Sequence, residues 1–175
     1  MQPFSIEVGH IRDRARSSLE DGAVTEAYRA DRTAVIDVLN QALATELVCV
    51  LRYRYHYYMA KGMASESVRK EFLEHAQDEQ DHADRIAARI VQLNGKPELD
   101  PSRLKERSHA QYVEGDGLTA MITEDLVAER IAIETYTAIL NWLGSDDPTT
   151  SRLIRDILER EEEHAEDMAS LLDKG

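Results

Sequence analysis

Apolar residues recur at alternating three- and four-residue steps along four long stretches of the chain. These stretches run from about 33 to 60, 66 to 93, 118 to 143 and 149 to 172. Such spacing places the apolar side chains on one face of an α-helix, so the pattern predicts four helices that each bury one stripe. Four prolines and eight glycines among 175 residues leave room for helices of this length.

The predicted boundaries carry residues that commonly start and stop helices. Asp31 is suited to cap the first helix, and Asn94 with Gly95 ends the second. Asp147 precedes Pro148, which suits the first turn of a helix because its missing N–H is not needed there. The sequence therefore predicts four separate helices rather than fewer, longer ones.

The lengths of the connections predict how the helices are arranged. The links between helices one and two and between three and four are short, so each pair should be an antiparallel hairpin. Residues 95–117 form a connection long enough to travel the length of a bundle. We expect an all-α fold, an antiparallel four-helix bundle of two hairpins joined by a long crossover. Residues 31–175 would form the bundle and residues 1–30 an N-terminal extension with a short helix.

Ionisable residues occur inside the apolar stripes at matched positions. The second and fourth helices each contain a Glu-x-x-His step, and a lone glutamate precedes each step by 33 or 32 residues. In a helix, residues three apart share a face, so each step offers a carboxylate and an imidazole to one point in space. The first half supplies Glu46, Glu79 and His82, and the second half supplies Glu129, Glu161 and His164.

Six buried ionisable side chains would be costly unless something neutralised them. Two divalent metal ions can do so, and carboxylates can bridge ions roughly 3.5 to 4 Å apart. We expect Glu79 and Glu161 to be the bridges. Oxygen and imidazole ligands suit iron, manganese or zinc, and the residues alone leave that choice open. A single Glu-x-x-His step would be read as solvated surface, but two matched steps favour a metal site.

Several neighbouring residues have simpler interpretations. Tyr53 is interpreted as a core aromatic residue whose hydroxyl holds a carboxylate, with a redox role as the alternative. Cys49 is interpreted as a small core residue. Surface positions are expected for Glu162 and Glu163. Exposure is also expected for Glu74 and Asp78, with an outer iron-binding surface as the alternative, and packing or surface roles for His10, His56, His75 and His109.

Composition limits the kinds of partner and the cellular compartment that we expect for this protein. The net charge of −13 opposes binding to nucleic acid, because phosphate backbones attract basic surfaces. The absence of an uninterrupted apolar run of about 18 residues argues against a membrane span, and the first residues lack the apolar stretch of a secretory signal. One cysteine suits a reducing compartment, so a cytoplasmic location is expected.

Four segments together resemble the ligand segments of bacterioferritins, within the ferritin-like superfamily, over about residues 33–172. They are Glu46-Leu-Val-Cys-Val-Leu-Arg-Tyr53, Asp78-Glu79-Gln-Asp-His82-Ala-Asp-Arg85, Asp125-Leu-Val-Ala-Glu129 and Glu161-Glu-Glu-His164. The resemblance implies that the bundle is ferritin-like and contains a ferroxidase centre that binds two iron ions per chain. There, O2 or H2O2 would take electrons from Fe(II), and ferric product would pass to a mineral store.

The chain departs from bacterioferritins at two places. The position of their haem-ligating methionine is Gln80, an amide that is a poor ligand, so haem is not expected. Only 11 residues follow His164, which leaves no fifth helix, and the N-terminal extension is similar to that of the smaller Dps-like cages. The resemblance therefore implies a homo-oligomeric 12-subunit shell, with a dimer or a 24-mer as the alternatives.

Two other functions compete with iron oxidation and storage as interpretations of the sequence. One is a di-metal peroxidase or catalase-like enzyme that acts on peroxide without mineral storage. Rubrerythrin is disfavoured because the chain has no rubredoxin-type cysteine pairs. The other is a structural bundle without metal, which gives no reason for six buried ionisable groups.

Overall fold

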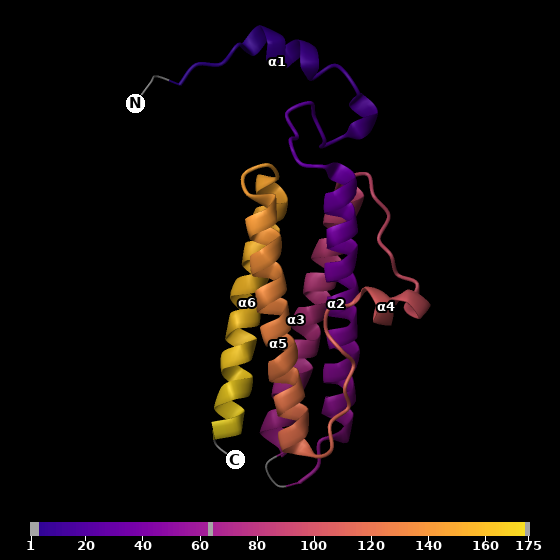
Figure 1. Ribbon diagram of the computed structural model, residues 1–175, viewed down its shortest axis with the longest axis vertical. Coiled ribbons are helices and arrows are strands. Elements are labelled where there is room, and N and C mark those ends of the chain that lie inside the picture. Colours follow the sequence, from indigo (N-terminus) through magenta and orange to yellow (C-terminus); the bar gives the residue numbers. More distant parts are fainter. Residues whose placement is uncertain (1–3, 63–64, 174–175) are drawn as a thin grey trace.

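The computed structural model describes residues 4–62 and 65–173, and the regular structure within these ranges is helical. Four long helices lie side by side, and shorter helical segments lie outside them (Figure 1). The elements are α1 (Val8–Arg14), η1 (Leu19–Asp21), α2 (Arg32–Met59), α3 (Ser65–Gln92), α4 (Pro101–Arg107), α5 (Leu118–Leu143) and α6 (Pro148–Asp173).

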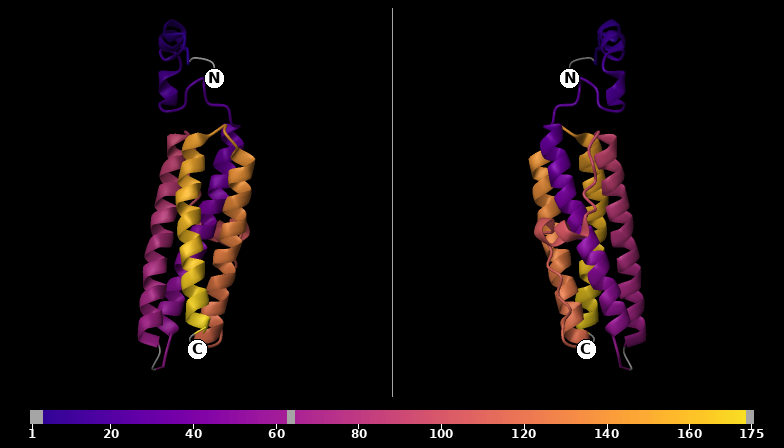
Figure 2. Two further views of the ribbon diagram at one scale, coloured as in Figure 1. Left: turned by 90° about the vertical axis from the view of Figure 1, so that its left-hand side faces the viewer. Right: turned by 90° about the vertical axis from the view of Figure 1, so that its right-hand side faces the viewer.

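The four long helices form two antiparallel hairpins, as the short links predict. α2 packs along α3 and α5 packs along α6, and the two pairs then face each other (Figures 1 and 2). The segment after α3 returns along the outside of the bundle, so α5 starts at the opposite end from where α3 stops. The predicted fold class, a four-helix bundle with a long crossover, is confirmed.

Local chemistry explains where the helices begin and end. The carboxylate of Asp31 accepts from the backbone N–H groups of Thr33 and Ala34 at 3.0 and 3.2 Å, which caps α2 as predicted. After α3 the chain turns tightly at Gly95, where a Cβ atom would lie 2.9 Å from side-chain carbons of Ile36 and Ile90. This close approach favours glycine, because a larger residue would displace these side chains.

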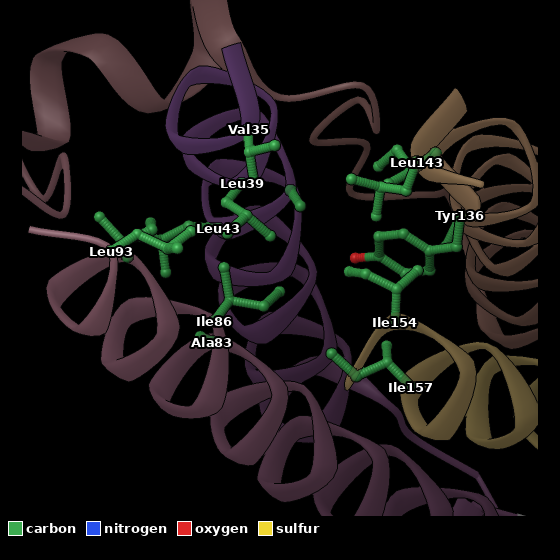
Figure 3. Close-up of a cluster of buried hydrophobic side chains, with 14 residues drawn as sticks. Val35, Leu39, Leu43, Ala83, Ile86, Leu93, Tyr136, Leu143, Ile154 and Ile157 are labelled. Carbon is green, nitrogen blue, oxygen red and sulfur yellow. The ribbon is translucent and has the colours of Figure 1, made fainter. Parts of the chain in front are cut away.

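An apolar core fills the end of the bundle near the start of α2. It combines side chains from all four long helices, and Figure 3 shows those of α2 and α3 facing those of α5 and α6. Its labelled members are Val35, Leu39, Leu43, Ala83, Ile86, Leu93, Tyr136, Leu143, Ile154 and Ile157. Burial of these groups is the main source of stability at this end.

The crossover contains a helix that the sequence interpretation missed. α4 is only seven residues long, begins at Pro101 and is capped by the Asp100 side chain, which accepts from Ser102 N at 2.9 Å. It packs against α2 on the outside of the bundle (Figure 1). A segment this short carries too little periodicity to be recognised as a helix from its pattern alone.

The N-terminal stretch lies beyond one end of the bundle (Figure 2). It is attached by the Tyr28 hydroxyl, which donates to Asp147 at 2.9 Å, and by an ion pair of Arg32 with Asp21. The apolar residues of α1, Val8 and Ile11, remain 45% and 41% exposed. The chain's own bundle therefore leaves this apolar side uncovered.

Candidate metal centre

Six acidic and histidine side chains converge in the middle of the bundle. All are between 0% and 3% exposed, and each of the four long helices contributes at least one of them. We refer to them as the six-residue centre: Glu46 from α2, Glu79 and His82 from α3, Glu129 from α5, and Glu161 and His164 from α6.

The ligand atoms of the centre form two overlapping groups. One contains Glu46 and His82, the other contains Glu129 and His164, and both include Glu79 and Glu161. Within each group the candidate atoms lie within 4.8 Å of one another. The two glutamates expected as bridges are therefore the two that the groups share.

The two imidazoles present the same nitrogen to the carboxylates. His82 Nδ1 lies 3.0 Å from a Glu161 oxygen and 3.4 Å from a Glu46 oxygen. His164 Nδ1 lies 3.6 Å from Glu79 and 3.5 Å from Glu161. Oxygens and nitrogens at these separations surround space that a small cation could share.

Most of these atoms have no hydrogen-bond partner among the residues that the structure describes. The unpaired buried atoms include one oxygen each of Glu46 and Glu79, both oxygens of Glu161, and Nδ1 of both His82 and His164. Buried polar groups are nearly always paired in folded proteins, and each unpaired one costs about 1–3 kcal/mol. Such a concentration of unpaired ligand atoms fits a metal-binding site.

The pKa values in the centre follow from this crowding. Burial raises the pKa of Glu46 well above its usual range, and the charges of Glu79 and Glu161 raise it further. The pKa of Glu129 is raised by the same three causes. Burial lowers the pKa of His82, but contacts with surrounding carboxylates raise it more, so its net shift is upward. Without cations, bound protons reduce the net negative charge here.

Further side chains orient the ligands from behind. The Tyr53 hydroxyl donates to Glu129, which agrees with its interpretation as a residue that holds a carboxylate. The carboxylate of Asp78 accepts from His164 Nε2 at 3.2 Å and from Arg160 at 2.7 Å. A proton on Nε2 of neutral His164 leaves the lone pair of Nδ1 facing the centre, which is the form that a metal ion needs.

His75 is the residue that the sequence interpretation undervalued. It is 1% exposed, its ring stacks on the ring of His164 with centroids 4.0 Å apart, and its Nδ1 lies 3.1 Å from the Tyr53 hydroxyl. Its position four residues before Glu79 places it one helical turn away on the same face. That spacing was the signal available in the sequence.

A second buried polar group lies next to the centre, and we call it the ion-pair cluster (Arg52, His56 and Asp125). Arg52 Nε donates to one Asp125 oxygen at 2.8 Å, and His56 Nδ1 lies 2.8 Å from the other. The cluster also binds the crossover, because Arg52 donates to the Gln111 carbonyl and His56 Nε2 donates to the Glu114 carbonyl. The role of His56 is thus structural, through hydrogen bonds that the expected surface or packing role did not include.

The remaining residues considered in the sequence occupy less specific positions. Cys49 is buried, and Asp78 is half-buried rather than exposed. Exposed positions are found for His10, Glu74, His109, Glu162 and Glu163. Gln80 donates to Asp84 on its own helix at 2.9 Å. None of these contributes to the two groups of the centre.

α2 is long and apolar enough to cross a membrane by length and composition, although the sequence led us to expect no span. Most of its apolar window is buried inside the bundle, which is typical of the core helix of a soluble protein. This single helix is therefore weak evidence for a membrane span.

Four long helices that surround a buried cluster of glutamates and histidines are typical of the class of four-helix-bundle proteins that bind metal ions through carboxylate and histidine ligands. The chain belongs to the ferritin family, because residues 36–175 match its ferritin-like domain.

Three similarities illustrate this relationship. A bacterioferritin of Desulfovibrio desulfuricans is 31% identical over 138 residues, which cover 78% of this chain and 73% of that protein. DNA protection during starvation protein 2 of Bacillus anthracis is 30% identical over 138 residues, covering 75% and 91%. The structure of a dodecameric thioferritin, the bacterioferritin-related protein of Bacteroides fragilis, superimposes with a TM-score of 0.80 at 33% identity, covering 83% and 88%.

Proposed function

We propose that this chain binds two iron ions at the six-residue centre, oxidises Fe(II) there with O2 or H2O2, and stores the ferric product. The main support for this proposal is the set of unpaired buried ligand atoms, which are arranged in two groups that share Glu79 and Glu161. When bound, the two ions would supply the electrons that reduce the oxidant. Manganese or zinc would fit the same oxygen and nitrogen ligands.

Charge balance supports a pair of divalent ions. With neutral imidazoles, the four carboxylates of the centre carry a charge of −4, which two divalent cations neutralise. One ion would leave a net negative charge in a buried space, and burial of unbalanced charge is costly. The centre is therefore suited to two ions rather than one.

The residues behind the ligands would keep the centre ready for metal. Tyr53 holds Glu129, and Asp78 holds His164 in the form whose Nδ1 is free to bind. Arg160 in turn holds Asp78 from the outer side. Partners of this kind orient metal ligands and commonly change metal affinity by about 10- to 100-fold when removed.

An anaerobic Fe(II) titration followed by exposure to air or peroxide tests the proposal. We expect two ions per chain at the centre and rapid oxidation. Glu79→Ala and Glu161→Ala should each abolish the rapid phase, because each removes a shared ligand. The exposed Glu162→Ala provides the matched control and should behave like the wild type. Unchanged rapid oxidation in both ligand variants would refute the assignment.

The fate of the product separates storage from peroxide chemistry. If the protein stores iron, ferric ion should remain with the protein through gel filtration after many Fe(II) equivalents have been oxidised. A di-metal peroxidase or catalase-like enzyme would instead consume peroxide repeatedly without accumulating ferric iron. That outcome would contradict iron storage as the function but would still be consistent with the proposed metal centre.

We propose a 12-subunit shell as the assembly, with α1 packing on a neighbouring subunit through the exposed side chains of Val8 and Ile11. The related thioferritin is described as dodecameric, and closed symmetric assemblies are the common form of soluble oligomers. Mass photometry should give a dominant species of 12 chains. A dominant 24-mer would refute the proposal, and a dimer would also contradict storage in an enclosed cavity.

We further propose a cytoplasmic location and no nucleic-acid partner. One relative carries DNA protection in its name, but the net charge of −13 opposes attraction to phosphates. A gel-shift assay at low salt, where such attraction is strongest, should show no complex with duplex DNA.

A further inference from the structure

The two hairpins repeat one spacing that lies outside the six ligands. Tyr53 follows Glu46 by seven residues on α2, and Tyr136 follows Glu129 by seven residues on α5. Seven residues make about two helical turns, so each tyrosine shares a face with the glutamate of its own helix. Both tyrosines are 0% exposed. Tyr136 therefore occupies in the second hairpin the place that Tyr53 occupies in the first.

The hydroxyl of Tyr53 reaches across to the opposite hairpin. It donates to Glu129, which belongs to the same ligand group as His164. If the two halves are related in this way, the corresponding partner of Tyr136 is Glu46, which belongs to the other ligand group with His82.

The two atoms that this correspondence would join both lack a partner. The hydroxyl oxygen of Tyr136 and Oε1 of Glu46 are buried and make no hydrogen bond among the residues that the structure describes. A phenol can donate one hydrogen bond, and a carboxylate oxygen accepts. Buried tyrosine hydroxyls usually find a partner, and phenylalanine would fill an apolar space without this requirement.

The surroundings of Tyr136 offer its hydroxyl no other side-chain partner. The ring belongs to the apolar core cluster, whose other buried members are aliphatic. Figure 3 shows the hydroxyl directed away from α5, into the space between the two hairpins and toward the side chains of α2 and α3. Leu43 of this cluster precedes Glu46 by three residues, so Glu46 lies about one turn further along α2.

The two tyrosines differ in their second neighbour. His75, four residues before Glu79, lies with Nδ1 3.1 Å from the Tyr53 hydroxyl. The corresponding position, four residues before Glu161, is the buried aliphatic Ile157. Tyr136 therefore has no histidine beside it, and its proton is available for a carboxylate.

We infer that Tyr136 is a positioning residue for Glu46, and this inference rests on the proposed function because it requires metal in the centre. Its hydroxyl donates to Glu46 in the metal-loaded protein, as the Tyr53 hydroxyl donates to Glu129. Glu46 can bind an ion through one oxygen and accept from Tyr136 with the other. The bond orients Glu46 and strengthens binding of the ion that Glu46 shares with His82.

Three variants, each Tyr to Phe, separate this role from packing. Tyr136→Phe removes the proposed bond and keeps the ring, and Tyr53→Phe removes the bond to Glu129. Tyr57→Phe changes a half-buried tyrosine of α2 outside the two ligand groups and is the matched control. Crystals of each variant and of the wild type are equilibrated anaerobically with a series of Co(II) concentrations. Anomalous scattering then gives the occupancy of each ion.

We expect Tyr136→Phe to require about tenfold more Co(II) to fill the position beside His82, with the position beside His164 much less affected. Tyr53→Phe should show the opposite pattern, and Tyr57→Phe should match the wild type. In the cobalt-loaded wild type, the Tyr136 hydroxyl should lie roughly 2.5–3.0 Å from a Glu46 oxygen.

Urea titration of the metal-free proteins shows whether a change in affinity reflects lost stability. Tyr136→Phe should unfold at the same or a higher urea concentration than the wild type, because it deletes a buried hydroxyl that has no partner in the metal-free chain. A loss of cobalt affinity at one position without a loss of stability is an effect that a packing role would not produce.

Two outcomes would overturn the role of Tyr136. One is a cobalt-loaded wild type whose Tyr136 hydroxyl makes no hydrogen bond to Glu46, and the other is a Tyr136→Phe variant that fills both positions at wild-type concentrations. Either result, with two ions bound in the wild type, leaves the proposed metal centre standing. A folded wild type that binds no cobalt would instead refute the proposed function, and the role of Tyr136 with it.

Discussion

Two groups of buried ionisable side chains lie next to each other in this bundle, and they differ in how their charges are satisfied. In the ion-pair cluster, Arg52 and His56 bind both oxygens of Asp125, and their remaining donors reach backbone carbonyls of the crossover. In the six-residue centre, many ligand atoms have no hydrogen-bond partner in the described chain. The first group completes itself with protein atoms, whereas the second is suited to added cations.

The comparison shows that burial alone does not separate structural from functional charges. Both groups are almost completely buried, and both draw residues from α2 and α5. The two groups differ in whether their hydrogen-bond donors and acceptors have partners within the protein. A buried carboxylate that is paired with a guanidinium group needs no further partner. Buried carboxylates that lie against one another and against the lone pairs of histidine nitrogens have no such partner, and this arrangement favours metal binding.

Breaking the ion-pair cluster should have the largest effect on the stability of the fold. Asp125→Ala leaves the Arg52 guanidinium buried without its partner, so we expect the free energy of unfolding of the metal-free protein to fall by about 3–5 kcal/mol. Urea titration measures this loss. Glu46→Gln, at an equally buried position, should cost little or even stabilise the metal-free protein, because burial and the charges of Glu79 and Glu161 already raise the pKa of Glu46 and disfavour its ionised form. Equal losses of unfolding free energy in the two variants would show that the ion-pair cluster and the six-residue centre do not differ in this way.

A cavity in the apolar end should have the next largest effect, with a different signature. Leu39→Ala removes a fully buried side chain from the core shown in Figure 3, and we expect a loss of about 2–5 kcal/mol. Metal content should remain two central ions per chain, because no ligand is affected. A fall in metal content along with stability would indicate that the apolar end also positions the ligands.

Metal binding should stabilise the protein through the centre only. At a free metal concentration 100 times the dissociation constant, one site adds about 2.7 kcal/mol to the free energy of unfolding. Because the centre is proposed to hold two ions, we expect a rise of up to about twice this size in the free energy of unfolding of the wild type, measured by urea titration with Mn(II) or Zn(II), which avoid oxidation. Asp147→Asn should keep the rise and Glu161→Gln should lose most of it. A rise of equal size in Glu161→Gln would contradict the assignment of that ligand.

The smallest expected effect concerns acid stability at the start of α6. Burial raises the pKa of Asp147, but hydrogen bonds from Thr150, Tyr28 and Arg89 lower it more, so its net pKa lies below the ordinary value of 3.8. Because the folded pKa is depressed, ionised Asp147 stabilises the fold above pH 3.8, and this contribution is lost as the pH falls through the folded pKa.

Asp147→Asn should therefore cost about 1–2 kcal/mol at neutral pH, since the amide keeps the helix cap but loses the ion pair with Arg89. The difference from the wild type should shrink as the pH is lowered below 3.8. Urea titrations at several pH values measure it. A difference that stays constant across this range would show that charge on Asp147 is not the cause.

The sequence by itself determined the fold class and the six candidate ligands. Helical periodicity identified α2, α3, α5 and α6 to within a residue or two at each end, because burial of one stripe imposes a regular spacing. The paired Glu-x-x-His steps were readable for the same reason, since residues three apart on a helix must share a face. The matched lone glutamates, Glu46 and Glu129, followed from the similarity of the two hairpins.

Only the tertiary structure decided how residues on different helices meet. The contact of His75 with Tyr53 and His164, and its nearness to Asp167, join three helices whose relative rotation no single periodicity encodes. The pairing of Arg52 with Asp125 likewise spans 73 residues of sequence. Local spacing is fixed by backbone geometry, whereas contacts between helices depend on how whole side-chain surfaces pack together, and that information is spread over the entire chain.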